Sequence, residues 1–309
     1  KRGNSDNEES VRYNYRLPDY IGSLGLEQTF DGYLRGQPGT RSVLVNNLGY
    51  RQSDSIPVLP QPGSNVVLTL DLEIQESAAK ALKETGGKGA AAVVIDVNNG
   101  DILAMTSIPV FDPNQFTPGI SHELWNSYLA ARPSPLIFRA TQERYPPGSI
   151  FKIVSGLALL EHGLNPTNQI YSAGYYQVGR RRINDTAAPG HYDFKRAFKK
   201  SSNTYFIHHT LDEGRGIKPI IEIGRQFFLG QSINLLPGQE AAGQFPTMSL
   251  IKQGWSDGDT ANISFGQGPI TATPLQMALM VATVANGGTV YHPRLIDRIE
   301  SPDPNEATH

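Results

Sequence analysis

A serine and a lysine three positions apart stand where the sequence predicts the start of a helix. Ser149 follows the turn-forming run Tyr-Pro-Pro-Gly at 145–148 and opens an apolar segment that ends near His162. Residues three apart share one helical face, so the Lys152 amine can reach the Ser149 hydroxyl and take its proton. Burial in this segment favours a neutral amine by lowering its pKa, and N–H groups of the first helical turn can hold an oxyanion. The spacing therefore predicts a serine nucleophile with a lysine base.

A second polar group lies in a break between two predicted helices, over 194–200 and 204–211. Ser201 can relay a proton, and the Asn203 amide can bind a substrate carbonyl. By itself this Ser-x-Asn is a helix cap. It follows Ser149 by 52 residues (201 − 149), which is enough chain to leave the nucleophile's helix and return beside it.

Both patterns are short, and both recur in this chain. Ser77 with Lys80 and Ser249 with Lys252 repeat the first, while the segments 5–7 and 232–234 repeat the second. Only Ser149 combines a forced helix start with a long apolar continuation, so we expect the other matches to be ordinary surface sequence.

The surrounding elements indicate an α+β fold with an antiparallel sheet. A strand is predicted from 66 to 70, a helix from 72 to 82 capped by Asp71, and a β-hairpin from runs at 89–97 and 102–105 joined by Asn-Asn-Gly-Asp. A last helix spans 274–285 and a strand region 289–299. Residues 1–17 are expected to be poorly ordered. The Gly- and Pro-rich stretch that follows suggests a small module over 1–64 before a main domain over 65–309.

Composition excludes several function classes. The net charge of −2 gives no case for nucleic acid, and the absence of cysteine rules out disulfides and thiolate chemistry. The arginines at 180–182 are expected to lie at a solvated hairpin turn. No apolar stretch approaches the roughly 20 residues of a membrane span, and the chain opens with a polar segment. We expect either a cytosolic protein or one whose membrane anchor is absent from this chain.

Metal ligands are sparse. Asp185 and His191 flank a short loop, and without a third ligand the pair is expected to be a polar turn. Adjacent residues on a helix point in different directions, so His208 and His209 are not expected to form a joint site. We predict neither a metal nor a cofactor.

The two candidate motifs together resemble those of penicillin-binding transpeptidases and serine β-lactamases. Further phrases are typical of the monofunctional, class B members of the first family: Leu-Thr-Leu-Asp at 68–71, Asp96 with Gly-x-Ile-Leu-Ala-Met at 100–105, Phe-Asp-Pro-Asn at 111–114, and Gly-Gln-Gly with Ala-Thr-Pro-Leu-Gln at 266–276. Tyr-Leu-Arg-Gly-x-Pro-Gly at 33–39 is similar to the elongation-type branch.

This resemblance implies a five-stranded antiparallel sheet flanked by helices, an N-terminal pedestal and, in the full protein, one membrane anchor. It also implies a D,D-transpeptidase that acylates its serine with D-Ala-D-Ala stem peptides, cross-links them during cell-wall elongation outside the cytoplasm, and is acylated by β-lactams. Ser149 would be the nucleophile, Lys152 its base, and Ser201 and Asn203 the relay and substrate-binding residues. Elongation-type relatives work with a membrane glycan polymerase and a scaffold protein.

The sequence departs from the family at one motif. Lys-Thr-Gly or Lys-Ser-Gly occurs nowhere in it, and we expect the 309 residues to stop before that motif. Without it, the substrate carboxylate lacks a cationic partner and the oxyanion lacks a second donor. Two alternatives remain open: a serine β-lactamase, which must hydrolyse its acyl-enzyme, and a catalytically silent penicillin-binding sensor or scaffold.

Overall fold

The computed structural model describes residues 20–302 except 87, 118 and 212, and these residues group into two units. The first unit holds the chain up to Thr69, Leu235–Gln239 and the chain from Arg294. The second holds Leu70–Asn234 and Glu240–Pro293. The expectations for residues 1–17 and for the chain end lie outside the described residues.

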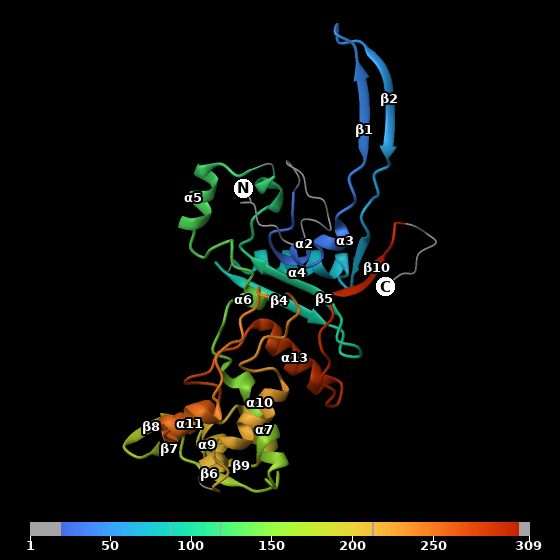
Figure 1. The fold of residues 1–309 in the computed structure, drawn as a ribbon. Coiled ribbons are helices and arrows are strands. Elements are labelled where there is room, and N and C mark those ends of the chain that lie inside the picture. Colours follow the sequence, from blue (N-terminus) through green and yellow to red (C-terminus); the bar gives the residue numbers. More distant parts are fainter. Residues whose placement is uncertain (1–19, 87, 118, 212, 303–309) are drawn as a thin grey trace. The chain divides into compact units, whose positions relative to one another are not determined.

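The first unit is built from short helices and two strand pairs (Figure 1). Its elements are α2 (Gly25–Thr29), α3 (Asp31–Leu34), β1 (Thr40–Val45), β2 (Arg51–Val58), β3 (Asn65–Leu68) and β10 (Ile296–Glu300). β1 and β2 form a long antiparallel ribbon whose residues are all exposed. β10 pairs antiparallel with β3, although more than two hundred residues separate them in the chain.

The predicted hairpin forms in the second unit, and two helices pack against it. β4 (Ala90–Ile95) pairs with β5 (Ile102–Ile108), with α4 (Leu72–Glu84) against β5 and α13 (Pro274–Ala285) against β4. The side chain of Asp71 caps α4 by accepting a hydrogen bond from the Ile74 N–H, as predicted. Gln75 fixes α4 on the strand, since its amide both accepts from the N–H of Met105, at 2.8 Å, and donates to its carbonyl, at 3.1 Å.

The remainder of this unit is mainly helical. Its elements are η1 (Pro113–Phe116), α5 (His122–Ala130), α6 (Arg139–Gln142), η2 (Gly148–Phe151), α7 (Lys152–Glu161), β6 (Ile170–Ser172), β7 (Tyr175–Val178), β8 (Arg181–Asn184), β9 (Gly190–Tyr192), α8 (Phe194–Lys200), α9 (Asn203–Leu211), α10 (Lys218–Gln226), α11 (Met248–Gly254) and α12 (Asp257–Ile263). The core joins α7, α10 and α13 through buried residues such as Val154, Ile220 and Met280, and includes Phe151 of η2. This packing fixes the helix that follows Ser149.

Two expectations differ from the structure. In its described part, strands pair only two by two, because the chain between β5 and β10 folds into helices and the local pairs β6–β9 and β7–β8. The strand expected from residue 289 begins at Ile296 instead, since the Asn286 side chain accepts hydrogen bonds from the N–H groups of Gly288 and Thr289 and holds a turn there. Among the described helices, none combines the length and apolar character that crossing a membrane demands.

Candidate active site

The turn that presents Ser149 is fixed at both of its ends. Tyr145 exchanges two backbone hydrogen bonds of 2.9 Å with Ala272, and Gly148, at φ +58°, donates its N–H to the carbonyl of Gly266 at 3.0 Å. The first helical turn is 3₁₀ rather than α, so Ser149 lies in η2 and Lys152 begins α7. Ser149 is exposed while Phe151 is fully buried, which anchors the turn and leaves the hydroxyl accessible.

Lys152 lies beneath this turn with its amine among oxygen atoms. Its side chain is only 2% exposed. The Nζ atom lies 2.7 Å from Asn203 Oδ1, 3.0 Å from Ser201 Oγ, 2.6 Å from the Ser201 carbonyl and 3.5 Å from Ser149 Oγ. Burial lowers the pKa of Lys152 from 10.5 to about 8, against the opposing effect of the nearby Asp185 carboxylate. At pH 7 about a tenth of this amine is therefore neutral and able to accept a proton.

Ser201 bridges the serine and the lysine. Its Oγ donates to Ser149 Oγ at 2.9 Å and accepts from Lys152 Nζ at 3.0 Å. The direct contact between Lys152 and Ser149, at 3.5 Å, is at the limit of a hydrogen bond. Ser201 ends α8 in the left-handed conformation, at φ 57°, which aims its hydroxyl toward Ser149. The shorter path for a proton from Ser149 to Lys152 therefore passes through Ser201.

The structure thus brings together all four residues that the sequence singled out. Asn203 begins α9 and is 7% exposed, with its Oδ1 on Lys152 and its Nδ2 donating to the carbonyl of Asn184 at 3.2 Å. Asp185 was not among the predicted site residues, yet its carboxylate accepts hydrogen bonds from Ser202 Oγ and the Asn203 N–H. Its position shortly after the hairpin turn predicted at 180–182 was the available signal, since a carboxylate at a strand end can cap a neighbouring helix.

The other short matches lie elsewhere. Ser77 and Lys80 are exposed on α4, and Ser249 and Lys252 are exposed on α11. Ser232 donates to Glu240 at 3.1 Å within a turn, and the match at 5–7 lies outside the described residues. Arg180 lies in the turn between β7 and β8, and Arg181 and Arg182 begin β8. The Arg182 guanidinium stacks 3.7 Å from the centre of the Tyr175 ring.

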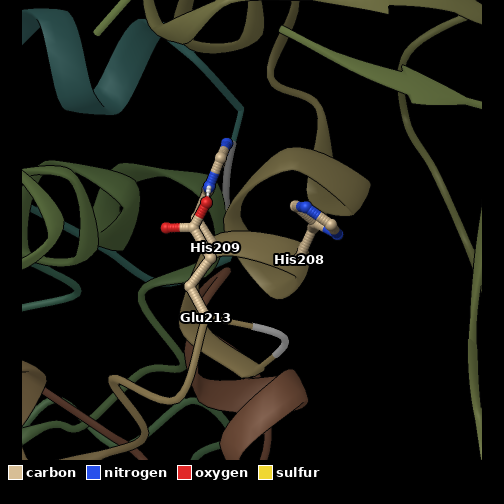
Figure 2. A group of neighbouring side chains, drawn as sticks. All are labelled: His208, His209 and Glu213. Carbon is tan, nitrogen blue, oxygen red and sulfur yellow. Dashed lines mark hydrogen bonds and ion pairs between the residues drawn. The ribbon is translucent and has the colours of Figure 1, made fainter. Parts of the chain in front are cut away.

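Figure 2 shows a histidine group at the far end of α9. The rings of His208 and His209 are inclined by 78°, as expected for neighbours on a helix, yet one ligand atom of each lies within 4.8 Å of the other and of a Glu213 oxygen. Glu213 accepts from His209 Nδ1 at 3.0 Å and forms an ion pair with Arg215. The guanidinium already supplies a cation to this carboxylate, so the arrangement is an ion-pair network. His191 instead packs on Tyr171, with ring centres 5.2 Å apart.

Comparison with known proteins agrees with this geometry. Residues 90–309 match the family model of the penicillin-binding protein transpeptidase domain, and residues 2–68 match that of the penicillin-binding protein dimerisation domain. The chain is 34% identical over 301 residues to the peptidoglycan D,D-transpeptidase MrdA of Escherichia coli, covering 94% of this chain and 46% of that protein. It therefore spans about half the length of the curated relatives it matches.

Solved structures show the same fold. One, from work on polymerization and crosslinking by a peptidoglycan synthase complex, aligns with a TM-score of 0.83 at 33% identity, covering 98% of this chain and 56% of the other. The complex of penicillin-binding protein PBP2 with MreC from Helicobacter pylori aligns with a TM-score of 0.80 at 27% identity, again covering 98% of this chain and 56% of the other. The resemblance predicted from the motifs is confirmed: the chain belongs to the penicillin-binding proteins, in the MrdA-like class B branch, with a dimerisation module ahead of its transpeptidase domain.

Proposed function

We propose that this chain is the catalytic part of a peptidoglycan D,D-transpeptidase of cell-wall elongation, and that β-lactams acylate it at Ser149. The observation that carries the proposal is the hydroxyl of Ser201, which lies within 3.0 Å of both Ser149 Oγ and the Lys152 amine. The relatives named peptidoglycan D,D-transpeptidase support the choice of reaction.

Acylation begins when Ser149 Oγ attacks the carbonyl carbon of the penultimate D-Ala of a donor stem. The hydroxyl proton passes through Ser201 to the neutral Lys152 amine. The tetrahedral intermediate collapses by breaking the C–N bond to the terminal D-Ala, whose nitrogen takes a proton from the Lys152 ammonium and leaves as an amine. An ester on Ser149 remains.

Transfer reverses these steps. A neutral amine of an acceptor stem attacks the ester carbonyl and gives up a proton toward Lys152, and the C–O bond to Ser149 breaks as Oγ is protonated again. A new amide bond then joins two stems, and the enzyme is regenerated. In a β-lactam the broken C–N bond belongs to the ring, so the leaving nitrogen stays tethered to the acyl group and the ester persists.

Ser201 and Asn203 have separate roles in this scheme. Ser201 relays the proton, whereas Asn203 both orients Lys152 through Oδ1 and presents its amide to the carbonyl side of a bound stem. We also place the protein outside the cytoplasm, because its substrate is the cell wall. Its partners would be a glycan polymerase and an MreC-like scaffold, by analogy with the complexes in which the solved relatives occur.

The test is the intact mass of the chain after incubation with benzylpenicillin, followed by addition of an amine acceptor. We expect one adduct on Ser149, none in Ser149→Ala, and an unchanged adduct in Ser249→Ala, the matched serine of a surface motif. The same test is run on a longer chain that carries a Lys-Thr-Gly segment. Transfer of the acyl group to the amine supports a transpeptidase.

Three results would argue against it. Rapid hydrolysis that regenerates free enzyme indicates a β-lactamase. A stable adduct without transfer to any amine, in both chains, indicates a sensor or scaffold. No adduct on either chain rules out the serine acylation proposed here.

A further inference from the structure

Asp185 lies directly after β8 and points its carboxylate at the start of α9. Oδ1 accepts from the Asn203 N–H at 2.6 Å and from the Ala187 N–H at 3.2 Å. Oδ2 accepts from Ser202 Oγ at 2.7 Å, Ser172 Oγ at 2.8 Å and the Thr204 N–H at 3.4 Å. Both oxygens are thus used, and most of their donors belong to the segment 202–204.

These contacts make Asp185 a cap supplied from outside the helix. The first N–H groups of a helix have no partner within it and carry partial positive charge, so an anion there is stabilising. Although burial raises the pKa of Asp185, the hydrogen bonds from Ser202 and the neighbouring donors outweigh it and leave that pKa below its usual value. The carboxylate therefore remains ionised wherever the enzyme works.

The capped segment carries the two residues that meet Lys152. Asn203, whose N–H is held by Asp185, presents Oδ1 to the amine, and Ser201 stands immediately before the held Ser202. A left-handed conformation is unfavourable for a non-glycine residue, so Ser201 adopts φ 57° only where its neighbours are fixed.

We propose that Asp185 is a positioning residue of the reaction: by capping α9 through Ser202 and Asn203, it holds Ser201 and Asn203 against Lys152. No hydrogen bond joins Asp185 to Lys152, so it acts on the amine through these neighbours and through its charge. This inference rests on the proposed function. The inference extends that function by giving a role to a residue outside both catalytic motifs.

The charge provides a signature that a purely structural role lacks. In the described part of the chain, Asp185 is the one charged group that shifts the pKa of Lys152, and it raises it. The other close neighbours of the amine are neutral: Ser149, Ser201, Asn203 and the Phe206 ring, whose centre is 5.8 Å away. Removing the carboxylate charge must therefore lower the pKa of Lys152 further.

The experiment compares Asp185→Asn and Asp185→Ala with Asp71→Ala, which removes the same kind of cap from α4. We measure the second-order rate constant of acylation by benzylpenicillin across pH, with melting temperatures of all variants. A misplaced catalytic group costs on the order of 100-fold in rate, and we expect that loss in Asp185→Ala and a smaller one in Asp185→Asn. The acidic limb of the profile should move to lower pH in both, and Asp71→Ala should acylate like the wild type.

Two results would overturn the proposal: an unchanged rate and pH limb in Asp185→Asn, or an equal loss of rate in Asp71→Ala at matched destabilisation. If neither the wild-type chain nor the longer chain that carries a Lys-Thr-Gly segment is acylated, the proposed function fails instead. Hydrogen exchange of the Asn203 and Thr204 amides then decides the positioning role, because it must quicken at least tenfold in Asp185→Ala and stay unchanged in Asp71→Ala.

Discussion

Lys152 is buried, yet the proposed mechanism requires its amine to change protonation state in every cycle. Burial lowers the pKa of Lys152 to about 8, which leaves part of the amine neutral near neutral pH, and the amine lies within hydrogen-bond distance of the Ser201 hydroxyl. A surface lysine, with a pKa near 10.4, would be almost entirely charged under the same conditions. Burial is thus what makes a lysine usable as a base here.

The pH dependence of acylation follows from this. Only the neutral amine accepts a proton, so the rate should fall about tenfold per pH unit below the Lys152 pKa of about 8 and level off above it. Acylation rate constants measured from about pH 6 to about pH 9.5 check this expectation. Lys152→Arg, whose guanidinium stays charged, should be inactive throughout. A flat profile in the wild type would show that Lys152 is not the base.

The same pKa has a consequence for stability, and its sign can be worked out. The folded pKa, about 8, lies below the unfolded value of 10.5, so between these limits the unfolded chain binds more protons. The contribution of Lys152 to the free energy of unfolding therefore rises with pH across this window and is smallest below it.

The sequence predicted Ser149, Lys152, Ser201 and Asn203 but not the use of Asp185. Local spacing places Ser149 and Lys152 on one face of a helix. Ser201 and Asn203 were recognised as polar residues in a break between two predicted helices, and the family motif supports them. Asp185 acts across 18 residues of chain on the Asn203 N–H, and no short-range pattern encodes which strand end will face which helix start. From the sequence alone, Asp185 was expected to belong to a polar turn.

At the scale of elements, the nucleophile's turn depends on a glycine from another segment. A side chain at Gly266, at φ +78°, would place its Cβ 2.0 Å from the Gly148 carbonyl oxygen and 2.7 Å from the Cβ of Phe151. Real structures do not contain such contacts, so the backbone around Ser149 would have to move. Close approach of two backbones thereby explains the first glycine of the phrase Gly-Gln-Gly.

Gly266→Ala should therefore slow acylation by at least about tenfold, because the Ser149 hydroxyl leaves its position beside Ser201. Gly163→Ala is the matched control, since Gly163 has φ +82° but nothing within 4 Å of the added methyl group. It should cost about 1 kcal/mol of stability and leave acylation unchanged. Equal acylation rates in the two variants would contradict a role of Gly266 in placing the turn.

Elements were predictable where local rules agree. The N-cap Asp71 before an amphipathic run predicted α4, and Asn-Asn-Gly-Asp between apolar runs predicted the β4–β5 hairpin. Pro274 at the start and Asn286-Gly287 at the end predicted α13. The strand predicted from residue 289 starts at Ile296 instead, because β-propensity carries no information about the Asn286 side chain, which holds the chain in a turn. The pairing of β3 with β10 is equally invisible to local patterns.

At the scale of the whole molecule, the proposed catalytic residues and the β1–β2 ribbon belong to different units. Ser149, Lys152, Asp185, Ser201 and Asn203 all lie in the unit built from Leu70–Asn234 and Glu240–Pro293. The β1–β2 ribbon belongs to the other unit and exposes apolar side chains along its length, including Leu44 and Ile56. Exposed residues contribute little to folding, whereas the catalytic unit depends on its buried core.

The double variant Leu44→Ser/Ile56→Ser should therefore leave the rate of acylation by benzylpenicillin unchanged and alter stability by less than about 0.5 kcal/mol per site. These side chains are 56% and 55% exposed and bury little apolar area. Phe151→Ala is the opposing case, since a fully buried ring in the core next to Ser149 should cost about 3–5 kcal/mol and most of the activity. Denaturant titration and acylation kinetics on the same samples measure both effects. Slower acylation in the ribbon variant would contradict the expectation that these exposed side chains take no part in the reaction.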